Sequence, residues 1–193
     1  EYQFAELEEK HNKQAMSLIK GKFGCEMMIP SSISGYMQGE NFLWFSDFNN
    51  PSKVETLSFA VYSYPYTSPD NFSEEHFIHM RDSVMKENIP GGEPDSYIQT
   101  EAGSVTLTAT AYNGKYMSVA RGLWYMENDD MFGGGPFISH SIVDEENGKV
   151  IVAEAFVYAP NKAKAGFMRK LEASLYTLEL PKEQEEASAQ QTK

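Results

Sequence analysis

The sequence predicts a single α+β domain, built on an antiparallel sheet of about seven strands that is covered by two to three helices. Two Asn-Gly pairs, Asn113-Gly114 and Asn147-Gly148, each separate two runs of alternating apolar and polar residues. Asn-Gly accepts positive φ at both positions of a tight turn, so each pair predicts a hairpin of adjacent antiparallel strands. Apolar residues at helical spacing elsewhere predict the helices that bury the apolar face of the sheet.

The front of the chain changes from helical to strand periodicity. Apolar residues recur at helical spacing over 3–19, and the segment is predicted to form a connecting helix that spans residues 1–20. Alternation over 23–29 then predicts the first strand. Strands over 41–47 and 56–64 complete a three-stranded antiparallel start.

The back of the chain carries the clearest pattern. A helix is expected from the capping pair Asn71 and Glu74 to about Glu87. The two Asn-Gly pairs then predict a four-stranded meander over 104–112, 115–125, 137–144 and 149–159.

The end of the chain is predicted to be helical, then extended, then disordered. Pro160 and Asn161 open a final helix, and residues 176–180 are expected to be extended. The predicted α+β domain therefore covers residues 21–180. The polar tail 181–193 lacks periodicity and is predicted to be disordered.

Composition excludes several classes of function. The 193 residues carry a formal net charge of −12, which argues against binding to nucleic acid or to an anionic bilayer and suits cationic ligands or basic partners. Cys25 is the single cysteine, so no intramolecular disulfide forms. The chain begins at Glu1 without a signal peptide and has no apolar run of about 20 residues. We expect a removed leader or a fragment, with any membrane contact made through a lipid anchor outside this chain.

Two residues of the predicted meander could carry chemistry. Arg121 lies in an apolar strand, where a cation usually pairs with a carboxylate or an aromatic ring; it could instead hold a ligand carboxylate. His140 alternates with isoleucines, which predicts a core histidine with satisfied hydrogen bonds, the alternative being a base in a pocket. Glu154 falls on the opposite face, near Ser139, and is not an obvious partner for His140.

The segment 127–136, ENDDMFGGGP, joins two predicted strands. Its acids, Glu127, Asp129 and Asp130, would repel phosphate. Calcium is a better ligand for them, although their spacing is not that of an EF-hand loop. A flexible or close-packed turn is the default interpretation.

Other candidates have ordinary structural interpretations. Cys25 is predicted to be a small buried hydrophobe. His76 and His79 are expected on a solvated helix start, the alternative being a zinc site. The aromatic stretch 42–45 and its tyrosine neighbours suit a core, or alternatively a ligand groove.

The predicted function is a non-catalytic module that binds an unknown protein or a small ligand. Its candidate surface comprises Arg121, Trp124, Glu127, Asp129, Asp130 and His140. No catalytic residue, cofactor or metal is predicted. The alternatives are a hydrolase-type or metal-dependent enzyme that uses the acidic Gly-rich loop, and a structural spacer domain.

Three short motifs carry a family resemblance: Arg121-Gly-Leu-Trp124, Gly134-Gly-Pro-Phe137 and Phe156-Val-Tyr-Ala-Pro160. On these, the chain resembles an uncharacterised family of bacterial lipoproteins of the Bacteroides type, known as a domain of unknown function. The resemblance covers residues 1–180 and is most specific over 118–180; Gly133 is an extra glycine beside the second motif.

This resemblance implies the C-terminal portion of an exported protein, tethered in the cell envelope on the periplasmic or outer-membrane side. It brings no catalytic residue with it, because the family has no assigned activity. The order of elements is also loosely similar to the PsbP-like α/β/α sandwich, a likeness of fold that says little about function.

Overall fold

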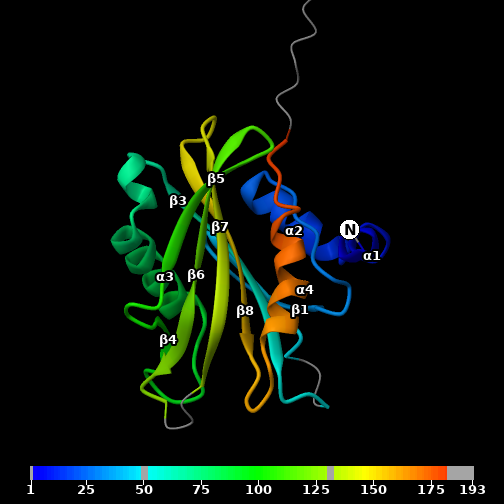
Figure 1. Ribbon diagram of the computed structural model, residues 1–193, viewed down its shortest axis with the longest axis vertical. Helices are drawn as coiled ribbons and strands as arrows, with labels where there is room; N and C mark the ends of the chain where they lie inside the picture. The colour runs from blue at the N-terminus through cyan, green and yellow to red at the C-terminus, as the bar shows by residue number, and fades with distance from the viewer. Residues whose placement is uncertain (1, 49–51, 130–132, 182–193) are drawn as a thin grey trace, which may run out of the picture.

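An antiparallel sheet of eight strands forms the middle layer of the protein, and helices cover both of its faces (Figure 1). This computed structural model describes residues 2–48, 52–129 and 133–181. The strand order is β1-β2-β3-β8-β7-β6-β4, and β5 also pairs with β6. The predicted fold class is therefore confirmed.

The strands are β1 (Gly35–Gly39), β2 (Phe42–Ser46), β3 (Thr56–Pro65), β4 (Tyr97–Thr100), β5 (Thr106–Tyr112), β6 (Lys115–Glu127), β7 (Gly134–Asp144) and β8 (Lys149–Tyr158). The helices are α1 (Tyr2–Glu9), α2 (Lys13–Phe23), the short 3-10 helix η1 (Pro69–Phe72), α3 (Glu74–Asn88) and α4 (Ala165–Leu175).

The predicted meander from β5 to β8 is confirmed, and its two turns differ. Tyr112 pairs with Lys115 across a two-residue turn in which Asn113 and Gly114 both have positive φ. Asp144 pairs with Lys149 instead, so the second hairpin has a four-residue loop, and in it only Gly148 has positive φ. The second Asn-Gly pair thus marks the hairpin correctly but not the type of turn.

The predicted first strand over 23–29 is wrong as a member of the sheet. This segment makes an isolated bridge between Glu26 and Glu179. The predicted extended segment 176–180 is therefore right around Glu179, but Tyr176 and Thr177 form a turn after α4. The alternating residues of 23–29, Cys25, Met27 and Ile29, are all fully buried. An extended segment that packs on the face of a sheet buries every second residue, as a strand within the sheet does. Periodicity alone therefore could not distinguish the two arrangements.

Other boundaries also shift. The connecting helix is divided into α1 and α2, because Asn12 caps α2 by accepting a hydrogen bond from the Ala15 backbone N–H. The middle helix is capped by Ser73 rather than Asn71. Asn71 lies in η1, which Ser68 caps, and its side chain accepts a hydrogen bond from the Ser68 backbone N–H. Strands β1 and β4 were not predicted.

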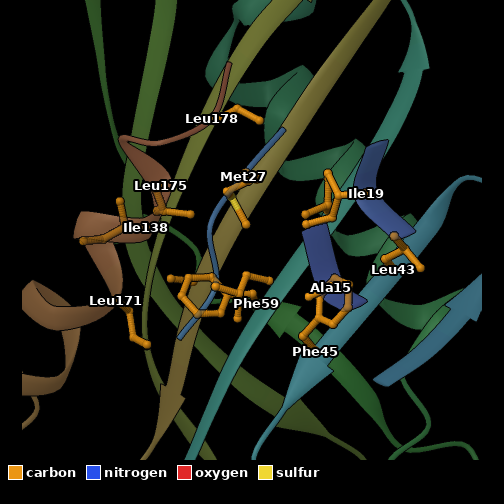
Figure 2. Close-up of a cluster of buried hydrophobic side chains, with 14 of the residues drawn as sticks. Ala15, Ile19, Met27, Leu43, Phe45, Phe59, Ile138, Leu171, Leu175 and Leu178 are labelled. Carbon is orange, nitrogen blue, oxygen red and sulfur yellow. The ribbon is translucent and has the colours of Figure 1, made fainter. Parts of the chain in front are cut away.

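One face of the sheet packs against α2, α4 and the extended segment between α2 and β1. The buried side chains of this layer come from all of these elements (Figure 2). They include Ile19 of α2, Met27 of the extended segment, Phe59 of β3 and Leu171 of α4. Burial of this layer anchors both ends of the described chain on the same side of the sheet.

The other face packs against α3 and contains a buried ion pair. Arg81 of α3 and Glu154 of β8 are both 0% exposed, and Arg81 Nη2 lies 2.7 Å from Glu154 Oε1. Ser139 Oγ donates to Glu154 Oε2 at 2.5 Å, and Arg81 Nη1 donates to Thr100 Oγ1 at 3.0 Å. The guanidinium carbon of Arg81 lies 4.0 Å from the centre of the Phe137 ring. This network fixes α3 to three strands at once.

Replacing Arg81 alone with Met should destabilise the protein by about 3–5 kcal/mol, because the Glu154 carboxylate would stay buried without its counter-charge. Replacing both residues, Arg81→Met with Glu154→Leu, should restore much of that loss, because a buried ion pair exchanged for apolar groups of similar volume is often nearly neutral. Urea unfolding of the three variants and the wild type measures this. A loss below about 1 kcal/mol in Arg81→Met would contradict a dry ion pair.

Candidate binding site

Beyond the C-terminal end of α3, the α3 face of the sheet carries a cavity of about 250 Å³. Its walls are mostly aromatic and aliphatic, with Trp44 of β2, Trp124 of β6, and Phe156 and Tyr158 of β8. Ile89 and Pro90, which directly follow α3, line it as well. The cavity therefore lies where the helix ends and the sheet continues.

Glycines shape this end of the sheet by leaving room rather than by unusual φ. A Cβ atom on Gly135 would lie 1.9 Å from the Val157 carbonyl oxygen and 3.4 Å from Trp124 Nε1. A Cβ on Gly122 would lie 2.8 Å from the Phe137 ring. The glycines of the two motifs thus allow Trp124 and Phe137 to lie directly against the strands. The Gly-rich segment was predicted to be a flexible or a close-packed turn, and at the start of β7 it is closely packed.

Two residues that line the cavity carry hydrogen-bond donors without partners among the described residues. The indole N–H groups of Trp44 and Trp124 are buried, and within the described ranges no atom accepts a hydrogen bond from either. A buried indole N–H usually has an acceptor. Small polar side chains, among them Ser58, and the carboxylate of Asp129 also line the cavity.

The predicted surface residues do not form one site. Trp124 and Asp129 line the cavity, and Glu127 lies at the end of β6, paired with Tyr97. Asp130 lies outside the described residues. Arg121 and His140 project from the opposite face of the sheet, among the residues that pack on α4. An enzyme that uses the acidic loop would need Arg121, His140 and the acidic side chains in one pocket. In the described part of the chain, Arg121 and His140 lie on the opposite face of the sheet from Asp129.

Arg121 forms the carboxylate pair that the sequence predicted. Its guanidinium contacts Glu172 of α4, and its side chain is 48% exposed. An ion pair as exposed as this contributes little to stability.

His140 is a core residue, as predicted, but its hydrogen bonds are not satisfied. Its side chain is fully buried and meets Tyr176 edge to face, with 4.7 Å between ring centres. Neither ring nitrogen makes a hydrogen bond of normal geometry to a described residue. Burial lowers the pKa of His140 to about 4, and the nearby Glu172 carboxylate and Leu175 carbonyl oppose this only in part. The imidazole is therefore neutral at physiological pH.

The remaining candidates have structural roles. Cys25 is fully buried, and burial raises the pKa of its thiol to about 12, which keeps it protonated and unreactive. His76 accepts or donates a hydrogen bond at 3.0 Å to the Asn71 side chain. Across residues 2–48, 52–129 and 133–181, no three His, Cys, Asp or Glu side chains gather closely enough to hold a metal ion. In the same ranges no helix has the length and apolar character to cross a bilayer.

Sequence reasoning missed two groups of residues on the α3 face. Glu154 interrupts an otherwise apolar strand, and Arg81 interrupts the apolar stripe of a helix. Two opposite charges in such settings are a signal for pairing that was present in the sequence. Trp44 was recognised only as part of an aromatic stretch, and nothing local indicates that it lines the same cavity as Trp124.

The fold and cavity define an antiparallel α/β/α domain with an aromatic cavity at one end of the sheet. The chain matches the model of a family described as a domain of unknown function, DUF4837, over residues 12–177. Since this match covers most of its length, the protein belongs to that family.

No curated protein matches the chain in sequence. Among solved structures, an uncharacterised protein from Rhizobium leguminosarum is similar at 13% sequence identity, covering 65% of this chain and 95% of that chain, with a TM-score of 0.24. A TM-score this low carries no argument about fold or function.

Acid should weaken the fold through His140. The unfolded chain binds a proton at the ordinary pKa of 6.5, whereas folded His140 binds one only near pH 4. Stability should therefore fall as the pH falls from 6.5 to 4, by roughly 3 kcal/mol from this residue. His140→Phe keeps an aromatic ring against Tyr176 and should remove that part of the pH dependence.

Urea unfolding of both proteins between pH 8 and pH 4 measures the difference. The other three histidines are common to both proteins and cancel in the comparison. Parallel stability profiles for the wild type and His140→Phe would show that the folded imidazole titrates normally.

Proposed function

We propose that this domain binds a small ligand in the cavity between Trp44 and Trp124. The observation that carries the proposal is that two of the mostly apolar residues lining the cavity, Trp44 and Trp124, have buried indole N–H donors for which the described structure offers no acceptor. A ligand that offers one or two acceptor oxygens on an apolar or aromatic body would satisfy both features. The volume of the cavity, about 250 Å³, suits a ligand of roughly ten non-hydrogen atoms, since larger ligands need larger pockets.

The surroundings of the cavity support access for a ligand. Trp44 is partly exposed, and its ring lies 5.3 Å from the ring of Phe48, which is 42% exposed. Met37, opposite Trp44 on β1, is 43% exposed. These exposed apolar side chains lie next to Trp44, which lines the cavity, and an apolar ligand would first make contact there.

Intrinsic fluorescence tests the proposal directly, because the chain has only two tryptophans and both line the cavity. Acetophenone, an aromatic ring with a carbonyl acceptor, should change the emission saturably, with a millimolar dissociation constant suited to its size. Ethylbenzene, which has a similar shape and no acceptor, should bind more weakly. Absence of any saturable change with acetophenone would contradict a ligand site in this cavity.

Filling the cavity should abolish the effect. A Cβ on Gly133 would lie 3.7 Å from the Tyr158 ring, an ordinary contact, so Gly133→Leu can place its side chain against the cavity wall without a backbone clash. The fluorescence response to acetophenone should be lost in this variant. Gly166→Leu, at a position in α4 with open space around it, is the matched control and should respond like the wild type.

We also propose that the domain acts in the cell envelope, as part of a lipoprotein anchored outside this chain. The support is the resemblance of its three motifs to a bacterial lipoprotein family, together with a net charge of −12 that disfavours nucleic-acid partners. Metabolic labelling with a palmitate analogue, followed by fractionation of cells that produce the natural full-length protein, tests this. An unlabelled protein recovered with the cytosolic fraction would contradict it.

A further inference from the structure

Strand β5 forms an open edge of the sheet. One side of β5 pairs with β6 over its full length, from Thr106 opposite Arg121 to Tyr112 opposite Lys115. On its other side, no segment of the described chain hydrogen-bonds to its backbone. Alternate residues of β5 therefore direct unpaired N–H and C=O groups outward, ready to pair with another strand.

This edge lacks the usual protection against pairing. Natural edge strands are blocked by charges, prolines, bulges or short length. No charged residue and no proline occurs from Ala102 to Gly114, although the chain as a whole has 44 charged side chains, 16 basic and 28 acidic. Five of the seven residues of β5 are exposed, and threonine and alanine make up most of the strand. A long, exposed and uncharged edge is suited to strand addition.

The other edges differ in this respect. Strand β1 is shorter and has glycine at each end, and Lys22 Nζ donates to the carbonyl oxygens of Gly39 at 2.9 Å and Glu40 at 3.1 Å. Strand β4 is covered in part by the segment after α3, through a bridge between Pro90 and Tyr97. Protection is thus present at β1 and β4 and absent at β5.

We propose that β5 pairs antiparallel with β5 of a second copy of this chain, around a two-fold axis at Ala109. Ala109 is the middle residue of the strand, so this register pairs all seven residues. It places Thr108 opposite Thr110 of the second copy on the α4 face, and Leu107 opposite Ala111 on the other face, since partners in an antiparallel pair share a face. The edge is therefore complementary to itself.

The lack of charge makes β5 the place where two copies of this acidic chain can approach with the least repulsion. Two molecules with a net charge of −12 repel one another over most of their surfaces. At β5 they meet along a stretch without charge, where threonine pairs contribute favourably. The contact area of a single strand pair is small, so the dimer should be weak, with a dissociation constant in the micromolar range. No residue of β5 lines the proposed ligand cavity, so the two proposals are independent.

Sedimentation equilibrium of the full chain from about 1 μM to about 500 μM at physiological salt tests the proposal. The wild type should pass from monomer to dimer. Ala109→Lys and Ala109→Glu each place like charges opposite one another at the two-fold axis, and each should weaken the dimer at least about tenfold. A mixture of the two variants should form a heterodimer, because opposite charges then meet.

The control is Met37→Lys, at an exposed position on the β1 edge, which should dimerise like the wild type. Circular dichroism confirms that each variant is folded, and Ala109 is exposed, so a lysine or glutamate there fits the monomer. A wild type that stays monomeric throughout, a dimer that Ala109→Lys does not weaken, or a mixture that stays monomeric would each overturn the proposal.

Discussion

The buried ion pair between Arg81 and Glu154 determines how the α3 side of the molecule is assembled. Two charges removed from water are unfavourable unless their mutual attraction and their hydrogen bonds compensate. Here Ser139 and Thr100 bind the remaining polar atoms, and Phe137 packs on the guanidinium. Any shift of α3 along the sheet would separate these partners, so the helix has one favourable position. The place where α3 ends, and with it the cavity, follows from that position.

The residues of the three short motifs pack together around this ion pair. Gly122 leaves the space that Phe137 occupies, and Phe137 in turn supports Arg81. Trp124 lies beside Gly135 and meets Phe156 edge to face, with 5.9 Å between ring centres. The motifs are separated in sequence but adjacent on β6, β7 and β8. Packing between neighbouring strands is therefore enough to explain why these three motifs occur in one chain, without a shared chemical role.

The fold could be predicted well where local signals agreed. Alternation and turn residues located β5 to β8, because a hairpin is decided by residues close in sequence. The segment at 23–29 and strand β4 depended on contacts with distant parts of the chain, such as the bridge between Glu26 and Glu179. Local pattern carries no information about these contacts, which is why one was placed in the sheet and the other was missed.

The candidate site was predictable only in part. Trp124 was chosen correctly as a wall of the cavity, whereas Trp44 comes from a distant part of the chain and could not be joined to it. The separation of Arg121 from Trp124 was available from the sequence, because residues three apart on one strand point to opposite faces. His140 shares the face of Arg121, since the two strands pair with Val119 opposite His140. Counting residues along β6 and β7 is therefore enough to divide the predicted surface between the two faces of the sheet.

The bridge between Glu26 and Glu179 has a consequence for the orientation of the domain. It joins the entering and leaving segments of the described chain, so both run along the α2 and α4 layer (Figure 1). An attachment through either segment would hold this layer toward the attachment point. The α3 layer would then lie on the far side of the domain, so that the aromatic cavity would face away from the attachment point.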